Sequence, residues 1–156
     1  MTTFDFGTGP VPAHQHPNGG GWVADTATVS ESAYVGPDAM VYGYAVVSDN
    51  VRVSGNARMY GNAVVFNDAW VSGDAVVSHN AVVSDNVSVY GNAVVYGNAV
   101  VSDNAVVSDN VRVSGNARVY GYAVVSGNAR VYGYAVLSGR AVVTGNARVY
   151  GELINK

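Results

Sequence analysis

The sequence predicts an all-β parallel solenoid, and two observations carry that prediction. Between Gly21 and Glu152 the chain consists of twenty-two consecutive hexads of the pattern Ala-x-Val-(Ser/Tyr)-(Gly/Asp)-Asn, without an inserted or deleted residue. The third place is Val in twenty hexads, with only Met59 and Leu137 as exceptions, and the first place is Ala in eighteen. Repetition at a fixed short period is the signature of a solenoid, in which each unit packs on its neighbours.

Each hexad predicts a short strand followed by a corner. Places one and three are apolar and alternate with places two and four, which is the period of a half-buried strand. Places five and six are mostly Gly, Asp or Asn, the residues that tolerate left-handed backbone and close turns. Because so short a strand cannot bury its Ala and Val alone, we expect it to pair in parallel with the equivalent strand one coil later.

The order Val-(Ser/Tyr)-(Gly/Asp)-Asn-Ala resembles the hexapeptide repeat of left-handed parallel β-helix proteins. The resemblance implies a single-stranded left-handed β-helix of triangular cross-section, with three hexads in each coil of eighteen residues and about seven coils in all. At a strand spacing of ~4.8 Å this is a rod roughly 35 Å long. Many members of that family are trimeric acyltransferases, but the unbroken repeat is closer to the family's non-catalytic repeat proteins. The kind of repeat favours a bacterial or phage origin.

The two ends of the rod are expected to differ. The predicted divisions are an N-terminal cap, a β-helix and a C-terminal tail, over residues 1–20, 21–152 and 153–156. An open solenoid end exposes core residues and strand edges, so we interpret Phe4 and Phe6, with Trp22, as a cap that plugs the first coil. The other end has no comparable cap, so either a partner copy covers it or the short tail with Lys156 is its only protection.

Composition limits the kinds of function. The 156 residues suffice for one ordinary domain, and cysteine is absent, which excludes disulfides and thiolate zinc sites. The net charge of -3, with 12% charged residues, gives no argument for a nucleic-acid or membrane partner. The first residues lack a basic segment followed by an apolar one, so we expect a cytoplasmic protein without a signal peptide.

Charge is unevenly distributed along the chain. Residues 1–100 hold two arginines and eight acidic residues, a net charge of -6, whereas residues 101–156 hold six basic and three acidic residues, a net charge of +3. The rod is therefore expected to be acidic where it begins and basic where it ends.

Residues eighteen apart are stacked neighbours in this arrangement, so the outward places form three faces. One of them, here called the Arg/Tyr face, holds the candidate ligand- or partner-binding residues Arg58, Arg112, Arg130, Arg148, Tyr96, Tyr132 and Tyr150. Arg112, Arg130 and Arg148 are expected directly above one another, where like charges repel. Stacking on tyrosine rings would offset part of this repulsion, and a bound anion would offset more. The simpler interpretation is that Arg and Tyr are only strand-compatible residues in a duplicated motif.

A second face is apolar. It places Val46, Val64, Val82 and Val100 in one outward column, here called the apolar face. Soluble monomers seldom expose such a strip, so we interpret it as the interface of a homo-oligomer, and the family resemblance favours a trimer. The alternative is that the valines are duplicated without function and stay hydrated. The third face is mixed at its start and apolar towards its end.

Catalytic and metal-binding groups are few. The acidic residues lie almost entirely at corners, where Asp caps its own turn, although Asp85 and Asp103, one coil apart, could hold a cation weakly. His14 and His16 could offer two imidazoles to a metal, but no further ligand lies near them in sequence. His79 is expected to be an exposed corner residue. We therefore predict no metal site, no cofactor and no catalytic residues.

The sequence favours a non-catalytic structural or interaction solenoid. In this interpretation the apolar face forms an oligomer and the Arg/Tyr face is presented to a protein or polymer partner. The alternative is that the Arg/Tyr face, or a groove between subunits, sequesters a small anionic ligand or nucleotide, because Arg offers a planar fork for phosphate and Tyr a stacking surface. A hexapeptide-type acyltransferase is a lesser alternative, because no loop or added domain extends from the repeat. An ice-binding face would need a regular array of Thr, and the outward places hold Val, Arg, Ser and Tyr instead.

Overall fold

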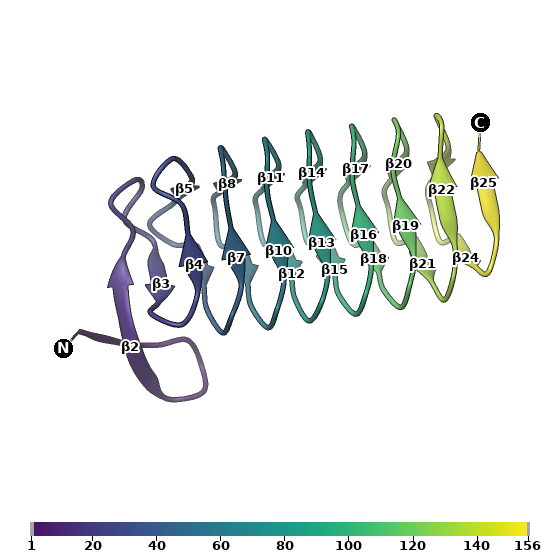
Figure 1. Cartoon of the computed structure of the whole chain (residues 1–156). Coiled ribbons are helices and arrows are strands. Elements are labelled where there is room, and N and C mark those ends of the chain that lie inside the picture. Colours follow the sequence, from purple (N-terminus) through teal and green to yellow (C-terminus); the bar gives the residue numbers. More distant parts are fainter. Residues whose placement is uncertain (1, 156) are drawn as a thin grey trace.

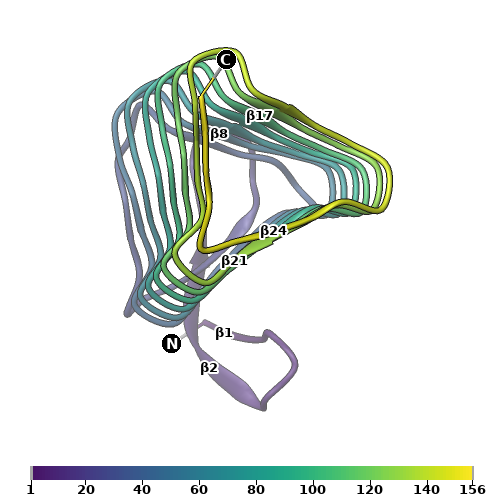
Figure 2. The same cartoon turned by 90° about the vertical axis from the view of Figure 1, so that its right-hand side faces the viewer.

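Strands recur about every six residues through the chain and form a parallel β-solenoid of about seven coils. The computed structural model describes residues 2–155, which contain strands, turns and no helix. Coils of eighteen residues stack along one axis (Figure 1), and the view along that axis shows a triangular outline (Figure 2). Met1 and Lys156 lie outside the described residues. The predicted role of Lys156 in protecting the last coil therefore lies outside them too.

The three sides of the triangle are three sheets. The first sheet has ten strands: β1 (Thr3–Asp5), β2 (Pro10–Gln15), β3 (Trp22–Ala24), β6 (Met40–Val41), β9 (Arg58–Met59), β12 (Val76–Val77), β15 (Val94–Val95), β18 (Arg112–Val113), β21 (Arg130–Tyr132) and β24 (Arg148–Tyr150). The second has eight: β4 (Thr28–Val29), β7 (Val46–Val47), β10 (Val64–Val65), β13 (Val82–Val83), β16 (Val100–Val101), β19 (Arg118–Val119), β22 (Val136–Ser138) and β25 (Leu153–Asn155). The third has seven: β5 (Tyr34–Val35), β8 (Arg52–Val53), β11 (Trp70–Val71), β14 (Ser88–Val89), β17 (Val106–Val107), β20 (Val124–Val125) and β23 (Val142–Val143).

Register follows the eighteen-residue period. Val64, for example, lies opposite Val46 on one side and Val82 on the other. The departure is β25, where Leu153 opposes Val136, so the segment that the sequence assigns to a separate tail adds the last strand of the second sheet. The predicted parallel pairing of equivalent strands is confirmed, whereas the left-handed winding stays a prediction from the resemblance.

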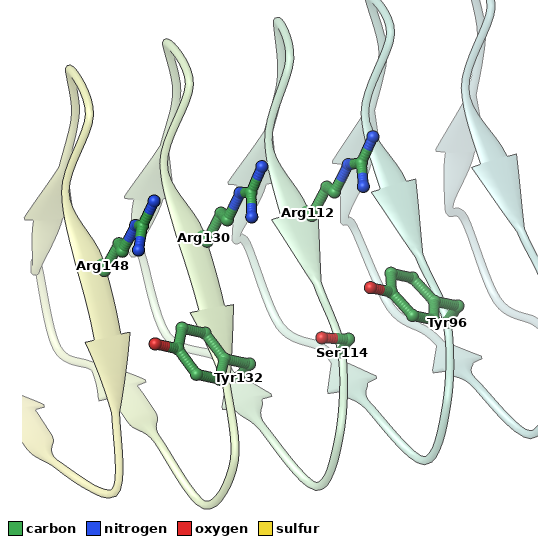
Figure 3. Close-up of a pocket in the computed structure, with 6 residues that line it drawn as sticks. All are labelled: Tyr96, Arg112, Ser114, Arg130, Tyr132 and Arg148. Carbon is green, nitrogen blue, oxygen red and sulfur yellow. The ribbon is translucent and has the colours of Figure 1, made fainter.

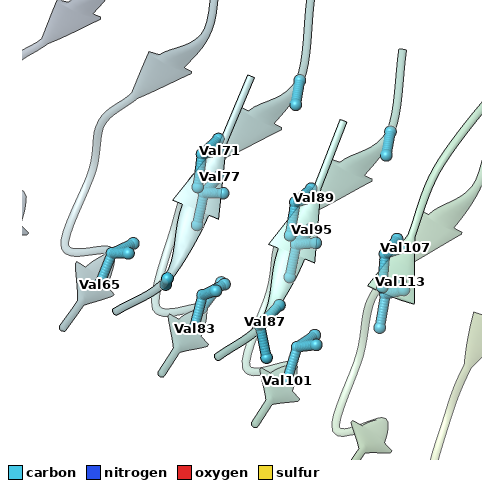
Figure 4. Packing of buried hydrophobic residues seen from close by; sticks show 14 of the residues in the cluster. Val65, Val71, Val77, Val83, Val87, Val89, Val95, Val101, Val107 and Val113 are labelled. Atoms are coloured by element: carbon cyan, nitrogen blue, oxygen red, sulfur yellow. The ribbon is translucent and has the colours of Figure 1, made fainter. Parts of the chain in front are cut away.

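The interior is filled by the first and third places of the hexad, as predicted. Their Ala and Val side chains form one continuous buried cluster, in which Met59 and Leu137 are the largest fully buried side chains. Valines from all three sheets point into the common interior, among them Val65, Val71 and Val77 (Figure 4). Small Ala next to each corner and larger Val at mid-strand match the narrow space, so these side chains fill the interior and are fully or nearly fully buried.

The N-terminal segment forms a β-hairpin and not a plug. Strands β1 and β2 pair antiparallel, and β2 pairs antiparallel with β3, so the hairpin extends the first sheet at its edge. It projects outside the triangular outline (Figure 2). The loop that follows β2 covers the edge of the third sheet, because Val35 donates a hydrogen bond to the carbonyl of Asn18 and Gly21 donates one to the carbonyl of Val35. The β-hairpin and this loop thus provide hydrogen-bond partners for the edges of β3 and β5, which would otherwise expose backbone groups.

Corners depend on left-handed backbone at the fifth place of the hexad. Gly55 has φ of 60°, and an added Cβ there would lie 2.9 Å from the backbone nitrogen of Gly73 in the next coil. Asp85 and His79 nevertheless adopt φ of 63° and 59° at equivalent positions. Non-glycine residues at this place therefore carry backbone strain that other contacts must offset.

Candidate functional site

Three arginines form a column on the outer surface of the first sheet. Arg112 lies opposite Arg130 in β18 and β21, and Arg130 lies opposite Arg148 in β21 and β24. All three are exposed, and their side chains extend side by side in the same direction (Figure 3). Within residues 2–155 no carboxylate comes within ion-pair distance of them. Adjacent charges at one strand spacing, ~4.8 Å, repel by up to about 1 kcal/mol in water, so the column concentrates positive charge on this surface.

The guanidinium groups do not stack on tyrosine rings as the sequence had suggested they would. In Figure 3 they point away from Tyr96 and Tyr132, which lie in a separate column two residues farther along each strand. In the part of the chain that the structure describes, no arginine makes a cation–π contact with these rings. The repulsion within the arginine column is therefore not offset by the protein itself.

Tyrosines form the second column of this surface. Tyr132 and Tyr150 stack with ring centroids 5.3 Å apart and ring planes 12° from parallel. Between Tyr96 and Tyr132 the column is interrupted by Ser114. The interruption coincides with a shallow depression of about 210 Å³, lined by Tyr96, Arg112, Ser114, Arg130, Tyr132 and Arg148 (Figure 3).

The structure thus brings together most of the predicted residues of the Arg/Tyr face. Arg58 lies apart, because β12 and β15 carry Val76 and Val94 at the equivalent place and separate it from the other arginines. Tyr150 is 62% exposed and continues the tyrosine column beyond the depression. Sequence reasoning missed Ser114, although the break it makes in the series of tyrosines eighteen residues apart was a readable signal.

A family comparison agrees with this architecture. A family model described as the YdcK Beta solenoid repeat matches six segments that cover about half of the chain, residues 57–73, 69–85, 88–103, 95–109, 111–127 and 123–139. The chain belongs to the YdcK β-solenoid repeat family. No curated protein matches it. Membership of the YdcK repeat family indicates a solenoid repeat protein. The resemblance to the hexapeptide repeat of left-handed β-helix proteins stays a prediction.

The family match includes most of the depression. The segments 95–109, 111–127 and 123–139 of the YdcK repeat contain every residue of its lining except Arg148. The description of the YdcK repeat names no activity, so the function of this surface is inferred from its geometry.

The apolar face is a continuous column in this YdcK-type solenoid. Val46, Val64, Val82 and Val100 lie opposite one another in successive strands of the second sheet, and each is half-buried by its neighbours. Arg118 follows Val100 in the same column and ends the apolar run. The face is therefore a strip four coils long that offers methyl groups to the solvent.

The predicted cap residues form an aromatic cluster on the outside of the first sheet. Phe4 stacks on Trp22 at 4.7 Å between ring centroids, and Phe6 stacks on Tyr42 at 4.8 Å. Phe6 is only 6% exposed and belongs to a cluster separate from the interior core. Phe4 and Phe6 therefore do not plug the first coil as predicted, because the β-hairpin places them over the outer face of the first sheet.

Tyr42 is the perturbed titratable group of this cluster. Burial raises the pKa of Tyr42, and the nearby Tyr60, whose ring centroid is 4.9 Å away, raises it further. The positive charge of Arg58 opposes this rise. The neutral phenol is therefore the form that the folded protein favours.

The corner acids accept most of their hydrogen bonds from neighbouring coils. One carboxylate oxygen of Asp103 accepts the backbone N–H of Gly121 at 3.0 Å, and Asp109 accepts that of Gly127 at 3.0 Å. Asp85 accepts the N–H of Asp103 at 3.3 Å. This differs from the predicted capping of each acid's own turn, because the fifth places of successive coils stack directly and bring a backbone N–H of the next coil within hydrogen-bond distance.

The histidines do not share a site. His14 and His16 lie two residues apart, and His14 Nδ1 is 2.7 Å from a carboxylate oxygen of Asp25 near the surface. His16 is 3% exposed, and its Nε2 donates a hydrogen bond to the carbonyl of Ala33 at 2.8 Å. Each imidazole thus has a structural partner of its own, and residues 2–155 hold no cluster of three or more metal-ligating side chains. The same residues include no helix of membrane-spanning length and apolarity.

Proposed function

We propose that this YdcK-family protein is a non-catalytic interaction solenoid. In this proposal the apolar face joins copies of the chain, with a trimer as the favoured state, and the Arg/Tyr face binds an acidic partner. The observation that carries the proposal is the column of Arg112, Arg130 and Arg148, which no carboxylate of residues 2–155 neutralises. A protein rarely maintains such unpaired like charges in register without a counter-charge, because the pairs repel.

The connections of the solenoid favour binding over catalysis. From β3 to β25 each strand passes to the next through a tight corner, so no loop extends from the coils to surround a substrate. The outward side chains are therefore held on a rigid surface whose spacing is set by the strands. Such a surface recognises a partner through an array of contacts at fixed intervals.

Binding of a labelled poly-glutamate peptide, followed by fluorescence anisotropy at low ionic strength, tests the acidic-partner proposal. We expect binding that weakens as salt is added, and that is lost when Arg112, Arg130 and Arg148 are all changed to Gln. Arg118→Gln is the matched control for the single replacement Arg130→Gln, because each removes one exposed arginine and Arg118 lies on the second sheet. If Arg118→Gln loses as much affinity as Arg130→Gln, binding reflects net charge alone and the proposal fails.

Sequestration of a small anion is a second candidate function. The specific observation in its favour is the depression of about 210 Å³ beside the arginine column, a volume suited to a small ligand and not to a protein segment. Thermal unfolding with and without nucleotides tests it. A ligand-dependent rise in the melting temperature at low salt, present in the wild type and absent in Arg130→Ala, is expected, and the absence of any rise removes this candidate.

A further inference from the structure

Serine replaces tyrosine at two levels of the tyrosine column on the first sheet. Where neighbouring levels both carry tyrosine, the rings stack in parallel, with centroids 4.9 Å apart for Tyr42 and Tyr60. The interruptions are Ser78, between Tyr60 and Tyr96, and Ser114, between Tyr96 and Tyr132. Each interruption removes one ring from an otherwise continuous stack.

The chain itself covers the first of these gaps. His79 follows Ser78 at the corner, and its Nδ1 lies 3.0 Å from the hydroxyl of Ser78. The imidazole is tilted by 54° to the ring of Tyr96, with ring centroids 6.1 Å apart. Ser78 is only 1% exposed. An aromatic ring can therefore lie beside this kind of gap, within hydrogen-bond distance of the serine hydroxyl and near a neighbouring tyrosine.

The second gap is open. Gly115 follows Ser114 and provides no side chain to cover it, so Ser114 stays partly exposed at the floor of the depression (Figure 3). Tyr96 and Tyr132 lie two strand spacings apart, about 10 Å. A ring at the level of Ser114 would lie about 5 Å from each of them, the separation at which aromatic rings pair favourably.

The two gaps also differ in charge. Beside Ser78 the outward places of β12 and β15 carry Val76 and Val94, whereas Arg112 and Arg130 lie beside Ser114. The arginine column is two residues along the strand from the tyrosine column, about 6.6 Å. With the side chains of Arg112 and Arg130 turned from the observed rotamers toward the tyrosine column, a ring in the gap at Ser114 would place a negatively charged group, joined to it by a short link, within reach of two guanidinium forks.

We propose that the gap at Ser114 is a binding slot for a small aromatic anion, a single planar ring system joined by a short link to a phosphate or carboxylate group. Tyr96 and Tyr132 would sandwich the ring, the hydroxyl of Ser114 would hydrogen-bond to it, and Arg112 and Arg130 would bind the charged group. This proposal rests on the proposed role of the Arg/Tyr face in binding anions.

Isothermal titration calorimetry at low ionic strength tests the slot, with phenyl phosphate, AMP, inorganic phosphate and adenosine as the probes. We expect at least one of the two aromatic phosphates to bind the wild type roughly tenfold or more tightly than inorganic phosphate does, because two ring contacts add to the charge contacts. Tighter binding of AMP indicates a nucleotide ligand, and tighter binding of phenyl phosphate indicates a simple aromatic anion. If neither exceeds inorganic phosphate, the slot does not exist.

Two variants fill the slot from within the chain. Ser114→Tyr restores the tyrosine column, and Gly115→His places an imidazole over Ser114 as His79 is placed over Ser78. Each is expected to lower the affinity for the aromatic phosphate to that for inorganic phosphate, while leaving inorganic phosphate binding unchanged. An unchanged preference for the aromatic phosphate in either variant, with a wild-type circular dichroism spectrum, overturns the proposal.

Failure of the slot can be told apart from failure of the anion-binding face. If inorganic phosphate binds the wild type and not Arg130→Ala, but the aromatic phosphates bind no better, the slot is refuted and the anion-binding face stands. If neither phosphate nor poly-glutamate binds at low salt, both proposals are refuted.

Discussion

Replacement of Asp85 at a corner of the solenoid should measure how strongly the coils are tied to one another. Its carboxylate accepts three hydrogen bonds, from the side-chain amide of Asn67 at 2.7 Å, the backbone N–H of Asp103 at 3.3 Å and the hydroxyl of Ser84 at 3.3 Å. The bonds from Asn67 and Asp103 connect three successive coils. The backbone of Asp85 is left-handed, with φ of 63°.

The magnitude follows from these contacts. Half-buried hydrogen bonds contribute about 0.5–1.5 kcal/mol each, so the loss of one short and two long bonds should cost about 2 kcal/mol. Asp85 itself carries about 1 kcal/mol of left-handed strain, which Ala retains and Gly relieves. We therefore expect Asp85→Ala to lower the free energy of unfolding by about 2 kcal/mol and Asp85→Gly by about 1 kcal/mol, or roughly 4–8 °C and 2–4 °C in melting temperature.

Urea denaturation followed by circular dichroism provides the measurement. Asp38→Ala is the control, because Asp38 is an exposed corner acid with no side-chain hydrogen bond to residues 2–155, and its loss should change stability by less than about 0.5 kcal/mol. Equal stability of the Ala and Gly variants would refute the strain argument. A Gly variant as stable as the wild type would refute the contribution of the bonds between coils.

Three further outcomes are expected. Val64→Asp should dissociate the proposed oligomer, as measured by size exclusion with light scattering. The control Val76→Asp, on the Arg/Tyr face, should not. A wild type that is monomeric at micromolar concentration contradicts the proposed interface. Deletion of residues 1–20 bares the edge of β3 and should cause aggregation or end-to-end assembly, so an unchanged monodisperse profile argues against the role of the β-hairpin. Because the pKa of Tyr42 is raised in the folded state, the contribution of its neutral phenol to the free energy of unfolding is complete below about pH 10. This contribution is lost as the pH rises through the pKa of Tyr42 in the folded state. Denaturation at about pH 9 and about pH 11 should therefore show a smaller decline for Tyr42→Phe than for the wild type, and an equal decline would contradict the shift.

The fold could be predicted because the interior of a solenoid admits little variation. Ala and Val recur at the first and third places, and their period determines strands, corners and coil length together. The N-terminal segment could not be predicted in the same way, since it has no repeat. Whether Phe4 and Phe6 plug the first coil or lie on the outer face depends on the turn between β1 and β2, which places them beside Trp22 and Tyr42.

The candidate site was predicted in part. The stacking of Arg112, Arg130 and Arg148 followed from the eighteen-residue period, because strand register carries over to outward side chains. The direction of the guanidinium groups did not follow, because several rotamers of a long side chain fit the same backbone. Ser114 could not be recognised from its own chemistry, because it contributes to the depression by being smaller than the tyrosines of the same column.

The covered gap at Ser78 and the open gap at Ser114 bear on how such a molecule can diversify. A repeat protein grows by duplication of whole coils, and each coil contacts only its neighbours, so one copy can change while the others preserve the fold. His79 on one level and Gly115 on the other show how little separates a filled position from a vacant one. A single replacement at a corner can therefore open or close a recess without moving a strand, and every level of the rod is available for the same change.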